Sequence, residues 1–439
     1  MKKPLVLLFT TSLLLSFTSC KKEGIDMAVI NKELEGCYNY FMGTTNYTEG
    51  SLGFGLTRDR LTKTSLCSIA ATGFLLASYP VFVEEGYMEK DRAKDIVDKT
   101  FDTVLRIQAD SETSYEGCIS HFVDMNTGKR EGTSEISTID TAILVSGVVT
   151  AAQYFKDGLV EKGNTIWGNV NFNKFTKTKG GKEHISMGTS SPNGENQLSP
   201  WDYYAEQLMI YILGAGNPNL EHRISNKYYK NITKNFGSYD GISHVYSWYG
   251  SLFTYQYSQA FFNFKRFNDP NGINYYENSV KASQTAYRYS KTLARNYKTF
   301  DSPAWGLTAC DTPFGYNGEL GTPPRGFDGS SASFIKAQGT VAPTAAIGSM
   351  PFTPTESYNA LKYYQSLERL NSKSYGLMDS YNLNVNGVEW YDPDIIGIDK
   401  GIEVLQLYNY KNTDFVSNLA MENPYVINGF LNNGFIEVK

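Results

Sequence analysis

Residues 199–214 place a carboxyl group beside two aromatic side chains, and this combination of residue types can do chemistry on a sugar. Trp201 and Tyr204 come just before Glu206, and an apolar run follows. A carboxylate is costly to bury unless it is paired or works as an acid. Flat rings for a pyranose and a proton donor are what a sugar-cleaving site needs. The alternative is an acidic residue favoured near a helix N-terminus by the helix dipole.

The same stretch is expected to be helical. Pro200 can occupy the first turn of a helix, which predicts a helix over 200–214. Residues three and four apart share one helix face, so Tyr204 would form an apolar stripe with Leu208 and Ile212. The carboxyl group would then lie next to this stripe.

The composition limits what the chain can be. Of its 439 residues, 41% are hydrophobic and 19% are charged, so a large core is possible and disorder is not expected. The net charge of −5 argues against a nucleic-acid partner, because nucleic-acid-binding proteins usually carry a basic patch. Aromatic residues make up 14%; some suit stacking on sugars, but most must pack in the core.

The N-terminus has the pattern of a signal peptide. A charged start at 1–3 is followed by an apolar stretch at 4–15, which is too short to span a bilayer as a helix. A small residue followed by Cys20 resembles a bacterial lipobox. We therefore expect a signal peptide at 1–19, a lipidated Cys20 with a short tether at 20–25, and a location in the bacterial cell envelope, on the periplasmic side or the outer-membrane surface. The alternative is an ordinary signal peptide with an incidental cysteine.

The other cysteines and the histidines show no metal-binding pattern. No CxxC spacing occurs among the cysteines at 37, 67, 118 and 310, so they are expected to be buried free thiols. The histidines at 121, 184, 222 and 244 show no ligand spacing either. We expect no transition metal and no cofactor, while calcium held by scattered carboxylates stays open.

Long apolar helices alternate with amphipathic ones along the chain. Apolar helices are expected at 65–85, 134–155, 342–350 and 396–408, and amphipathic helices at 91–107, 274–297 and 354–370. A helix covered on all sides is apolar, whereas an outer helix needs a polar face. The alternation predicts a double ring of inner and outer helices, because a solenoid would show a sequence repeat and none is found. No linker interrupts residues 26–439, so we expect one domain.

Three segments between the helices are expected to be irregular or β-structured. Residues 115–132 have the pattern of a β-hairpin with its turn at 125–129. Residues 169–199 are polar and rich in glycine, which indicates loops and short strands. Residues 300–339 form a long loop region, and loops of that length in a compact domain are usually functional.

Seven blocks of the sequence, taken together, resemble one known family. The blocks are GLTRDR at 55–60, SEISTIDTA at 134–142, WDYYAE at 201–206, YDGISH at 239–244 with the residues through 253, WGLTA at 305–309, GTVAPTAA at 339–346 and GIDKG at 397–401. They are similar to the bacterial glycoamylase-like family, which includes endo-β-1,2-glucanases. The similarity covers about residues 35–435 and keeps the order that the blocks have in that family.

The resemblance implies a fold and an activity. The implied fold is all-α, an (α/α)6 toroid whose active site lies in the central cavity, with long loops and short β-hairpins at the cavity mouth. The implied activity is inverting glycoside hydrolysis. Glu206 matches the glutamate of the family's Trp-x-x-Tyr-x-Glu motif and would be the general acid. The general base is not fixed by a shared motif.

Three further acids are candidates for the second carboxyl group. Inversion needs two carboxyls on opposite sides of the bond, about 6.5–9.5 Å apart, and one of them must stay protonated near neutral pH. Asp399 begins an apolar helix, where it could equally be a helix N-cap. Asp140 and Glu135 are expected on one helix; because they are more than one turn apart, at most one should face the cavity. Their alternative role is capping and a buried hydrogen bond.

Several other residues are candidates for sugar contact, in addition to Trp201 and Tyr204. Asp59 and Arg60 could clamp a sugar hydroxyl or only form ion pairs. Rings in aromatic loops stack on the apolar faces of sugars, and histidine can hydrogen-bond hydroxyls. On this ground His244, Trp248 and Trp305 are candidates, and the alternative for each is packing of the loop.

The sequence therefore predicts a monomeric, lipid-anchored, inverting glycoside hydrolase. Its expected substrate is an oligo- or polysaccharide, and β-1,2-glucan is the substrate that the resemblance favours. The membrane is a partner only through the anchor. One alternative is a non-catalytic glycan-binding lipoprotein of a polysaccharide uptake system, which would need a surface platform of aromatic rings but no facing carboxyls. Another is a glucoamylase-type enzyme that cleaves α-glucans.

Overall fold

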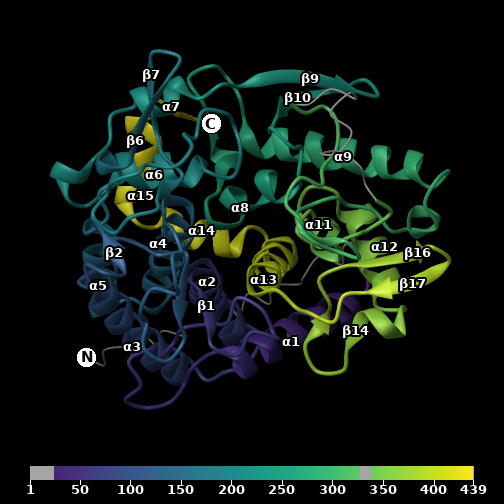
Figure 1. Ribbon diagram of the computed structural model, residues 1–439, viewed down its shortest axis with the longest axis horizontal. Helices are drawn as coiled ribbons and strands as arrows, with labels where there is room; N and C mark the ends of the chain where they lie inside the picture. Colours follow the sequence, from purple (N-terminus) through teal and green to yellow (C-terminus); the bar gives the residue numbers. More distant parts are fainter. Residues whose placement is uncertain (1–23, 327–337, 439) are drawn as a thin grey trace, which may run out of the picture.

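The computed structural model describes residues 24–326 and 338–438. Within these ranges the protein is mostly helical, and strands occur as short pairs (Figure 1). The predicted signal peptide at 1–19 and the predicted lipidation site Cys20 lie outside the described residues, as does most of the tether at 20–25.

Six helices in the described part of the chain are buried along nearly their whole length. They are α2 (Ile69–Glu84), α4 (Thr138–Phe155), α6 (Leu208–Gly216), α8 (Phe253–Phe261), α11 (Pro343–Ile347) and α13 (Gly397–Lys411). Helix α2 packs against α4 and α13, α4 also packs against α6, and α13 also packs against α8 and α11. They carry few charged residues because a helix covered on all sides must be largely apolar.

A second set of helices, each with one face exposed to solvent, covers the first. The set is α1 (Met27–Thr44), α3 (Lys90–Gln108), α5 (Gly158–Gly168), α9 (Tyr275–Leu293), α12 (Pro354–Tyr364) and α15 (Pro424–Asn432). Helix α1 packs on α13, α3 on α2, α5 on α4, α15 on α6, α9 on α8 and α12 on α11. The alternation of apolar and amphipathic segments in the sequence thus corresponds to inner and outer helices. Two shorter helices are α7 (Lys227–Asn231) and α14 (Phe415–Met421).

Helices α2 and α4 share the most extensive contact between elements in the described part of the chain. Their backbones approach at two glycines: a Cβ on Gly147 would lie 1.9 Å from the carbonyl oxygen of Gly73. The N-cap of α2 is Ser68, whose side chain accepts a hydrogen bond from the N–H of Ala71. It ends before Gly86, which has a φ of +73°. Helix α4 is long and apolar enough to cross a membrane by length and composition, yet 89% of it is buried inside the protein, as in a core helix.

The described strands form antiparallel pairs. These are β1 (Leu66–Ser68) with β4 (Phe122–Asp124), β2 (Ser114–Tyr115) with β3 (Cys118–Ile119), β5 (Ile136–Ser137) with β8 (Gly188–Thr189), β6 (Thr176–Lys179) with β7 (Lys182–Ile185), β9 (Asn235–Tyr239) with β10 (Ile242–Tyr246), β11 (Phe267–Asn268) with β18 (Ile436–Glu437), β12 (Cys310–Thr312) with β13 (Gly315–Asn317), β14 (Asn371–Ser372) with β15 (Gly376–Leu377), and β16 (Tyr381–Val385) with β17 (Val388–Tyr391). Strands β1 and β5 lead directly into α2 and α4. Short strand pairs therefore fix the N-terminal ends of two buried helices.

The predicted hairpin at 115–132 is confirmed in its second part but not in its first. The residues at its start belong to a separate tight hairpin, β2–β3. Strand β4 pairs with β1 on one side and with the segment after the turn on the other, where the N–H of Asp124 donates to the carbonyl oxygen of Lys129 at 2.8 Å and that of Glu131 to the carbonyl oxygen of Phe122 at 3.0 Å. The predicted turn at 125–129 does form, since Val123 and Arg130 make an isolated bridge around it. The cysteines at 37, 67, 118 and 310 are free and buried, as predicted.

Candidate active site

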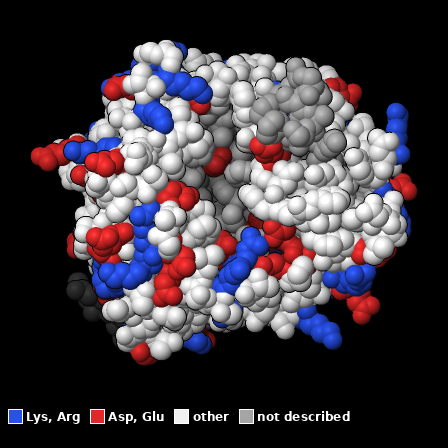
Figure 2. Space-filling view, in the orientation of Figure 1, with Lys and Arg blue, Asp and Glu red and all other residues white. Residues whose placement is uncertain are grey.

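A cavity of about 380 Å³ opens at the N-terminal ends of the buried helices. Ala70 reaches it from the start of α2, Asp140 from α4, Phe253 from α8 and Asp399 from α13. The corresponding face of the molecule is hollowed, and acidic side chains lie in and around the hollow (Figure 2). Its volume and its mixture of apolar and charged lining residues suit a small-molecule site.

Glu206 lies just before α6 and lines this cavity. Burial raises the pKa of its carboxyl to about 7, its own backbone N–H acts in the opposite direction, and the charge of Asp140 adds to the increase. The Ser258 hydroxyl donates a hydrogen bond of 2.6 Å to the backbone carbonyl oxygen of Glu206 and ties this turn to α8. The carboxyl can therefore hold a proton near neutral pH, as a general acid must.

The predicted helix over 200–214 is wrong in its first half, because α6 begins only after the Trp-x-x-Tyr-x-Glu motif. The backbone N–H of Trp201 donates to the carbonyl oxygen of Ile185 at 2.8 Å, and that of Tyr204 donates to Thr233 at 3.0 Å. These bonds to distant segments hold the motif in a non-helical conformation. The predicted apolar stripe shared with α6 consequently does not form.

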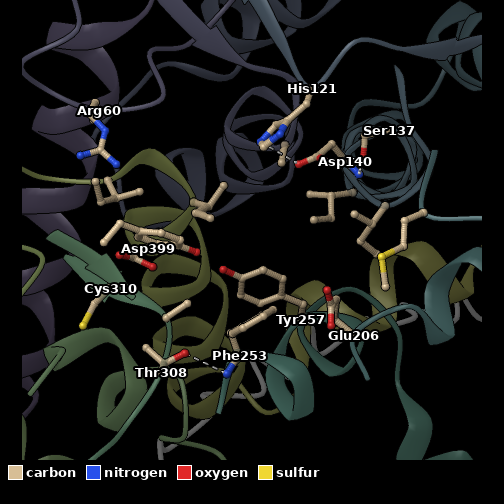
Figure 3. Close-up of a pocket in the computed structure, with 18 of the residues that line it drawn as sticks. Arg60, His121, Ser137, Asp140, Glu206, Phe253, Tyr257, Thr308, Cys310 and Asp399 are labelled. Carbon is tan, nitrogen blue, oxygen red and sulfur yellow. Dashed lines mark hydrogen bonds and ion pairs between the residues drawn. The ribbon is translucent and has the colours of Figure 1, made fainter. Parts of the chain in front are cut away.

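Asp399 lies across the cavity from Glu206 (Figure 3). It is in the first turn of α13, but Ile396 holds the N-cap position, so Asp399 is not the cap that was its alternative role. Burial raises the pKa of Asp399 to about 7, while a hydrogen bond from Asp379 acts against this increase. The hydroxyl of Tyr257 points into the space between the two acids (Figure 3).

His121 forms a charged cluster on another wall of the cavity. Its Nδ1 lies 2.9 Å from Glu135 Oε1, and its Nε2 lies 3.6 Å from Asp140 Oδ1. Burial alone would lower the pKa of His121, but the charges of Asp140, Glu135 and Asp59 together raise it to about 9. The ring is therefore an imidazolium at neutral pH. The same contact lowers the pKa of Glu135 against the effect of its burial.

The prediction that Glu135 and Asp140 share a helix, with at most one facing the cavity, is wrong. Helix α4 begins only at Thr138, and Glu135 precedes strand β5. Both carboxyls line the cavity and both face His121. Ser137 is the N-cap of α4 and donates its hydroxyl to Asp140 Oδ2 at 2.5 Å.

Arg60 lines the cavity and forms ion pairs with three aspartates. The nitrogen–oxygen distances are 2.8 Å to Asp311, 3.3 Å to Asp59 and 3.5 Å to Asp394. Burial raises the pKa of Asp59, and Arg60 counteracts the increase. Both predicted residues are thus engaged in ion pairs, and their contact with a sugar hydroxyl stays a prediction.

Of the five aromatic residues predicted to contact a sugar, one lines the cavity and four lie elsewhere. Trp201 lines the cavity, and its indole N–H donates to Thr138 Oγ1 at 3.2 Å. Tyr204 and Trp305 are buried in the core, and His244, on β10, is buried with its ring against Tyr255. These three do not line the cavity, and their contact with a sugar stays a prediction. Trp248 packs on Tyr203 at 4.7 Å and does not line the cavity.

Several lining residues were not among the predicted site residues, and the polar ones include His121, Tyr257, Tyr316 and Asp379. Tyr316 lies on β13 at the cavity mouth with an exposed ring. His121 has partners 14 and 19 positions further along the chain, so no local spacing marks it. Tyr257 ends a stretch rich in aromatic residues, 239–257, and no other feature of the sequence marks it.

Three clusters in the described part of the chain bring possible metal ligands within 4.8 Å of one another. They are His121 with Glu135 and Asp140, Asp311 with Asp379 and Asp392, and Glu33 with Cys37 and Glu403. In the last cluster Lys400 already lies 2.7 Å from both glutamates. The absence of a transition metal stays a prediction.

The fold and the site together define a class of protein. It is mostly helical, and its buried helices direct acidic side chains into one cavity. The chain belongs to the glycoamylase family: the family model described as "Putative glucoamylase" matches residues 198–424. The resemblance drawn from the seven sequence blocks is thereby confirmed.

One curated relative is an exo beta-1,2-glucooligosaccharide sophorohydrolase (non-reducing end) of Parabacteroides distasonis. It is 26% identical over 415 residues, which cover 85% of this chain and 54% of the relative. The chain thus spans about half the length of the curated relative it matches.

Solved structures share the fold. An endo-beta-1,2-glucanase of Chitinophaga pinensis, in complex with sophorotriose and glucose, has a TM-score of 0.78 at 22% identity and covers 93% of this chain and 98% of its own. A protein of Bacteroides uniformis described as a "putative glucoamylase" has a TM-score of 0.78 at 24% identity and covers 93% and 97%.

Proposed function

We propose that the protein is an inverting glycoside hydrolase that cleaves β-1,2-linked glucan. The observation that carries the proposal is the placement of Glu206 and Asp399 on opposite sides of one cavity (Figure 3). Burial raises the pKa of each carboxyl to about 7, so that one can carry a proton while the other is ionised. A glycan-binding lipoprotein without catalysis would need no facing carboxyls, which favours the enzyme.

In the proposed reaction Glu206 donates its proton to the glycosidic oxygen as the bond from that oxygen to the anomeric carbon breaks. Asp399 accepts a proton from a water molecule on the opposite face of the sugar, and the water oxygen forms the new bond to the anomeric carbon. The released sugar keeps the proton from Glu206, and exchange with solvent restores both carboxyls. Attack and departure on opposite faces invert the configuration.

Asp140 and Glu135 have a different part in this proposal. Both face the charged ring of His121, and Asp140 also accepts the hydroxyl of Ser137, so neither is as free as Asp399 to take a proton from water. Their oxygens are placed to accept hydrogen bonds from sugar hydroxyls. Trp201 and Tyr316 offer ring faces for the sugar at the wall and the mouth of the cavity.

The linkage rests on the relatives, since the named relative acts on beta-1,2-glucooligosaccharides and a structural neighbour is an endo-beta-1,2-glucanase. The test is incubation with linear β-1,2-glucan and, separately, with starch, followed by product analysis. The proposal expects soluble products from β-1,2-glucan alone. Products from starch alone would replace it with the α-glucan alternative, and no product from either would contradict glycoside hydrolysis of these linkages.

Glu206→Gln tests the acid in the same assay. General acid catalysis contributes about 10²–10⁴-fold, so kcat on the true substrate should fall by that factor. The melting temperature should change little, because the amide is isosteric. A folded variant with full activity would contradict the assignment.

We also propose that the two helical layers close into an (α/α)6 toroid. The support is the pairing of each of the six described buried helices with one amphipathic helix. A crystal structure in which the buried helices leave a gap in the ring would contradict closure.

Lipid anchoring at Cys20 in the bacterial cell envelope is likewise proposed, on the order of charged, apolar and small residues before that cysteine. Metabolic labelling with a radioactive fatty acid should mark the wild-type protein but not Cys20→Ala. Equal labelling of both would contradict the proposed site.

A further inference from the structure

Asp379 lines the cavity together with Asp399, shares a hydrogen bond with it and is 4% exposed. Its position is fixed by two backbone contacts. Its own N–H donates to the carbonyl oxygen of Asp394 at 3.1 Å, and its Oδ2 accepts the N–H of Asp311 at 2.8 Å. The side chain therefore has little freedom to turn away from its neighbours.

The other oxygen of this carboxyl, Oδ1, is buried and meets no N–H or O–H donor among the described residues. Besides the N–H of Asp311, the groups that hydrogen-bond with the Asp379 side chain are two further carboxyls, Asp399 and Asp392. Asp392 has the same feature: its Oδ1 accepts the N–H of Asp394 at 3.1 Å, while its buried Oδ2 has no donor. Carboxyls in such contact cannot all be ionised, so at least one proton is shared among them.

The described cations near this cluster are already engaged. Arg60 lies 2.8 Å from Asp311 and also faces Asp59 and Asp394. Lys400 lies 2.7 Å from Glu33 and 2.7 Å from Glu403, fully buried between them. Neither forms an ion pair with Asp379, Asp392 or Asp399. A proton is thus the simplest source of positive charge for these three carboxyls.

We propose that Asp379 is a positioning residue that keeps a proton and donates it in a hydrogen bond to Asp399, which thereby stays the ionised base. The inference rests on the proposed function for the role of Asp399, but not for the shared proton. Burial and the neighbouring charge of Asp399 raise the pKa of Asp379 well above its usual range, and the hydrogen bond lowers that of Asp399. Asp392 supports Asp379 from behind.

Two substitutions test whether Asp379 acts as a proton donor or as an ionised carboxylate. Asp379→Asn keeps the shape and supplies a permanent N–H donor, whereas Asp379→Leu removes the donor. Asp240→Asn, in the exposed turn between β9 and β10, is the matched control. We expect Asp379→Asn to keep kcat within about tenfold of wild type, and Asp379→Leu to lose about 10–100-fold, the usual effect of a hydrogen bond to a charged group. The acidic limb of the Asp379→Leu pH profile should move to higher pH, because Asp399 then lacks its donor.

A readout that does not depend on activity is the infrared absorption of protonated carboxylic acids. At pH 7 the wild type and Asp240→Asn should show such a band, and Asp379→Asn should show it reduced. If no glucan is cleaved but the band behaves in this way, the shared proton stands while the proposed function fails.

Three outcomes would overturn the inference. If Asp379→Asn is as inactive as Asp399→Asn and its melting temperature is unchanged, Asp379 must be ionised for activity. Equal activity of Asp379→Asn and Asp379→Leu would mean that the donor is irrelevant. A rise in wild-type melting temperature on adding calcium, lost in Asp379→Asn, would mean that Asp311, Asp379 and Asp392 hold a cation instead of a proton.

Discussion

The cavity has two acidic walls that compensate their charge in different ways. On the first wall Glu135 and Asp140 face His121, whose pKa they raise to about 9. On the second wall Asp399 meets Asp379, with further carboxyls behind and the nearby described cations engaged elsewhere. The negative charge of the first wall is compensated by a positive side chain, whereas that of the second wall has to be compensated by protons.

This difference determines what each wall can do. A carboxylate held by an imidazolium is stabilised in its charged form, so it suits lasting contacts with sugar hydroxyls. A carboxyl in a group that shares protons has a pKa near neutrality and can take up or release a proton within the working pH range. The second wall therefore suits a general base, opposite the proposed acid Glu206.

The largest expected effect is a difference in activity between variants of the two walls. Asp399→Asn removes the proposed base and should lower kcat by about 10²–10⁴-fold on the true substrate. Asp140→Asn removes a charge that is proposed to bind and orient the sugar, so the expected loss of kcat is smaller and KM should increase. Steady-state kinetics of both variants measures the contrast. A larger kcat loss for Asp140→Asn than for Asp399→Asn would move the base to the first wall.

The second effect concerns stability at the first wall. The folded-state pKa of His121 is raised from 6.5 to about 9, so its stabilisation is fully present below about pH 6.5 and is lost as pH rises through 9. His121→Gln should cost about 2 kcal/mol of unfolding free energy at pH 6, given about 1.4 kcal/mol per pKa unit and partial solvent access. Urea denaturation at pH 6 and pH 9.5 measures the gap, which should close at the higher pH. A constant gap would mean that packing, not charge, is lost.

The smallest effect has the opposite sign and concerns the second wall. Burial, with the charge of Asp379, raises the folded-state pKa of Asp392 from 3.8 to about 8. Between about pH 4 and pH 8 the unfolded chain has lost this proton while the folded protein still holds it. The free energy of unfolding therefore decreases as the pH rises through this range. Asp392→Asn keeps an oxygen for the Asp394 N–H and should stabilise the protein by about 1 kcal/mol at pH 8, but hardly at pH 4. The same denaturation series tests this, and destabilisation at pH 8 would contradict proton-based compensation.

Local sequence patterns predicted the inner and outer helices because burial on all sides leaves an apolar segment of helical length. The local pattern also pointed to Glu206, and the resemblance to the family pointed to Asp399, Asp140 and Glu135; all four line the cavity. The helix over 200–214 was wrong because its first backbone donors bond to Ile185 and Thr233, which no local rule relates to this stretch.

The aromatic candidates show a second limit of sequence reasoning. Trp201 and Trp305 are the same residue type in similar loop settings, yet Trp201 borders the cavity and Trp305 is fully buried with its indole N–H on the carbonyl of Glu356. Only the tertiary packing separates them. His121 and Asp379 were missed for a related reason, since their roles come from partners that are distant along the chain.

The central claim is that Glu206 and a base on the opposite wall act on the two faces of one sugar. The most direct measurement is proton NMR of the newly formed reducing end during hydrolysis of β-1,2-glucan, before mutarotation. An inverting reaction predicts that the α-anomer appears first. The β-anomer as the first product would mean retention, and it would contradict a water-activating base on the wall of Asp399.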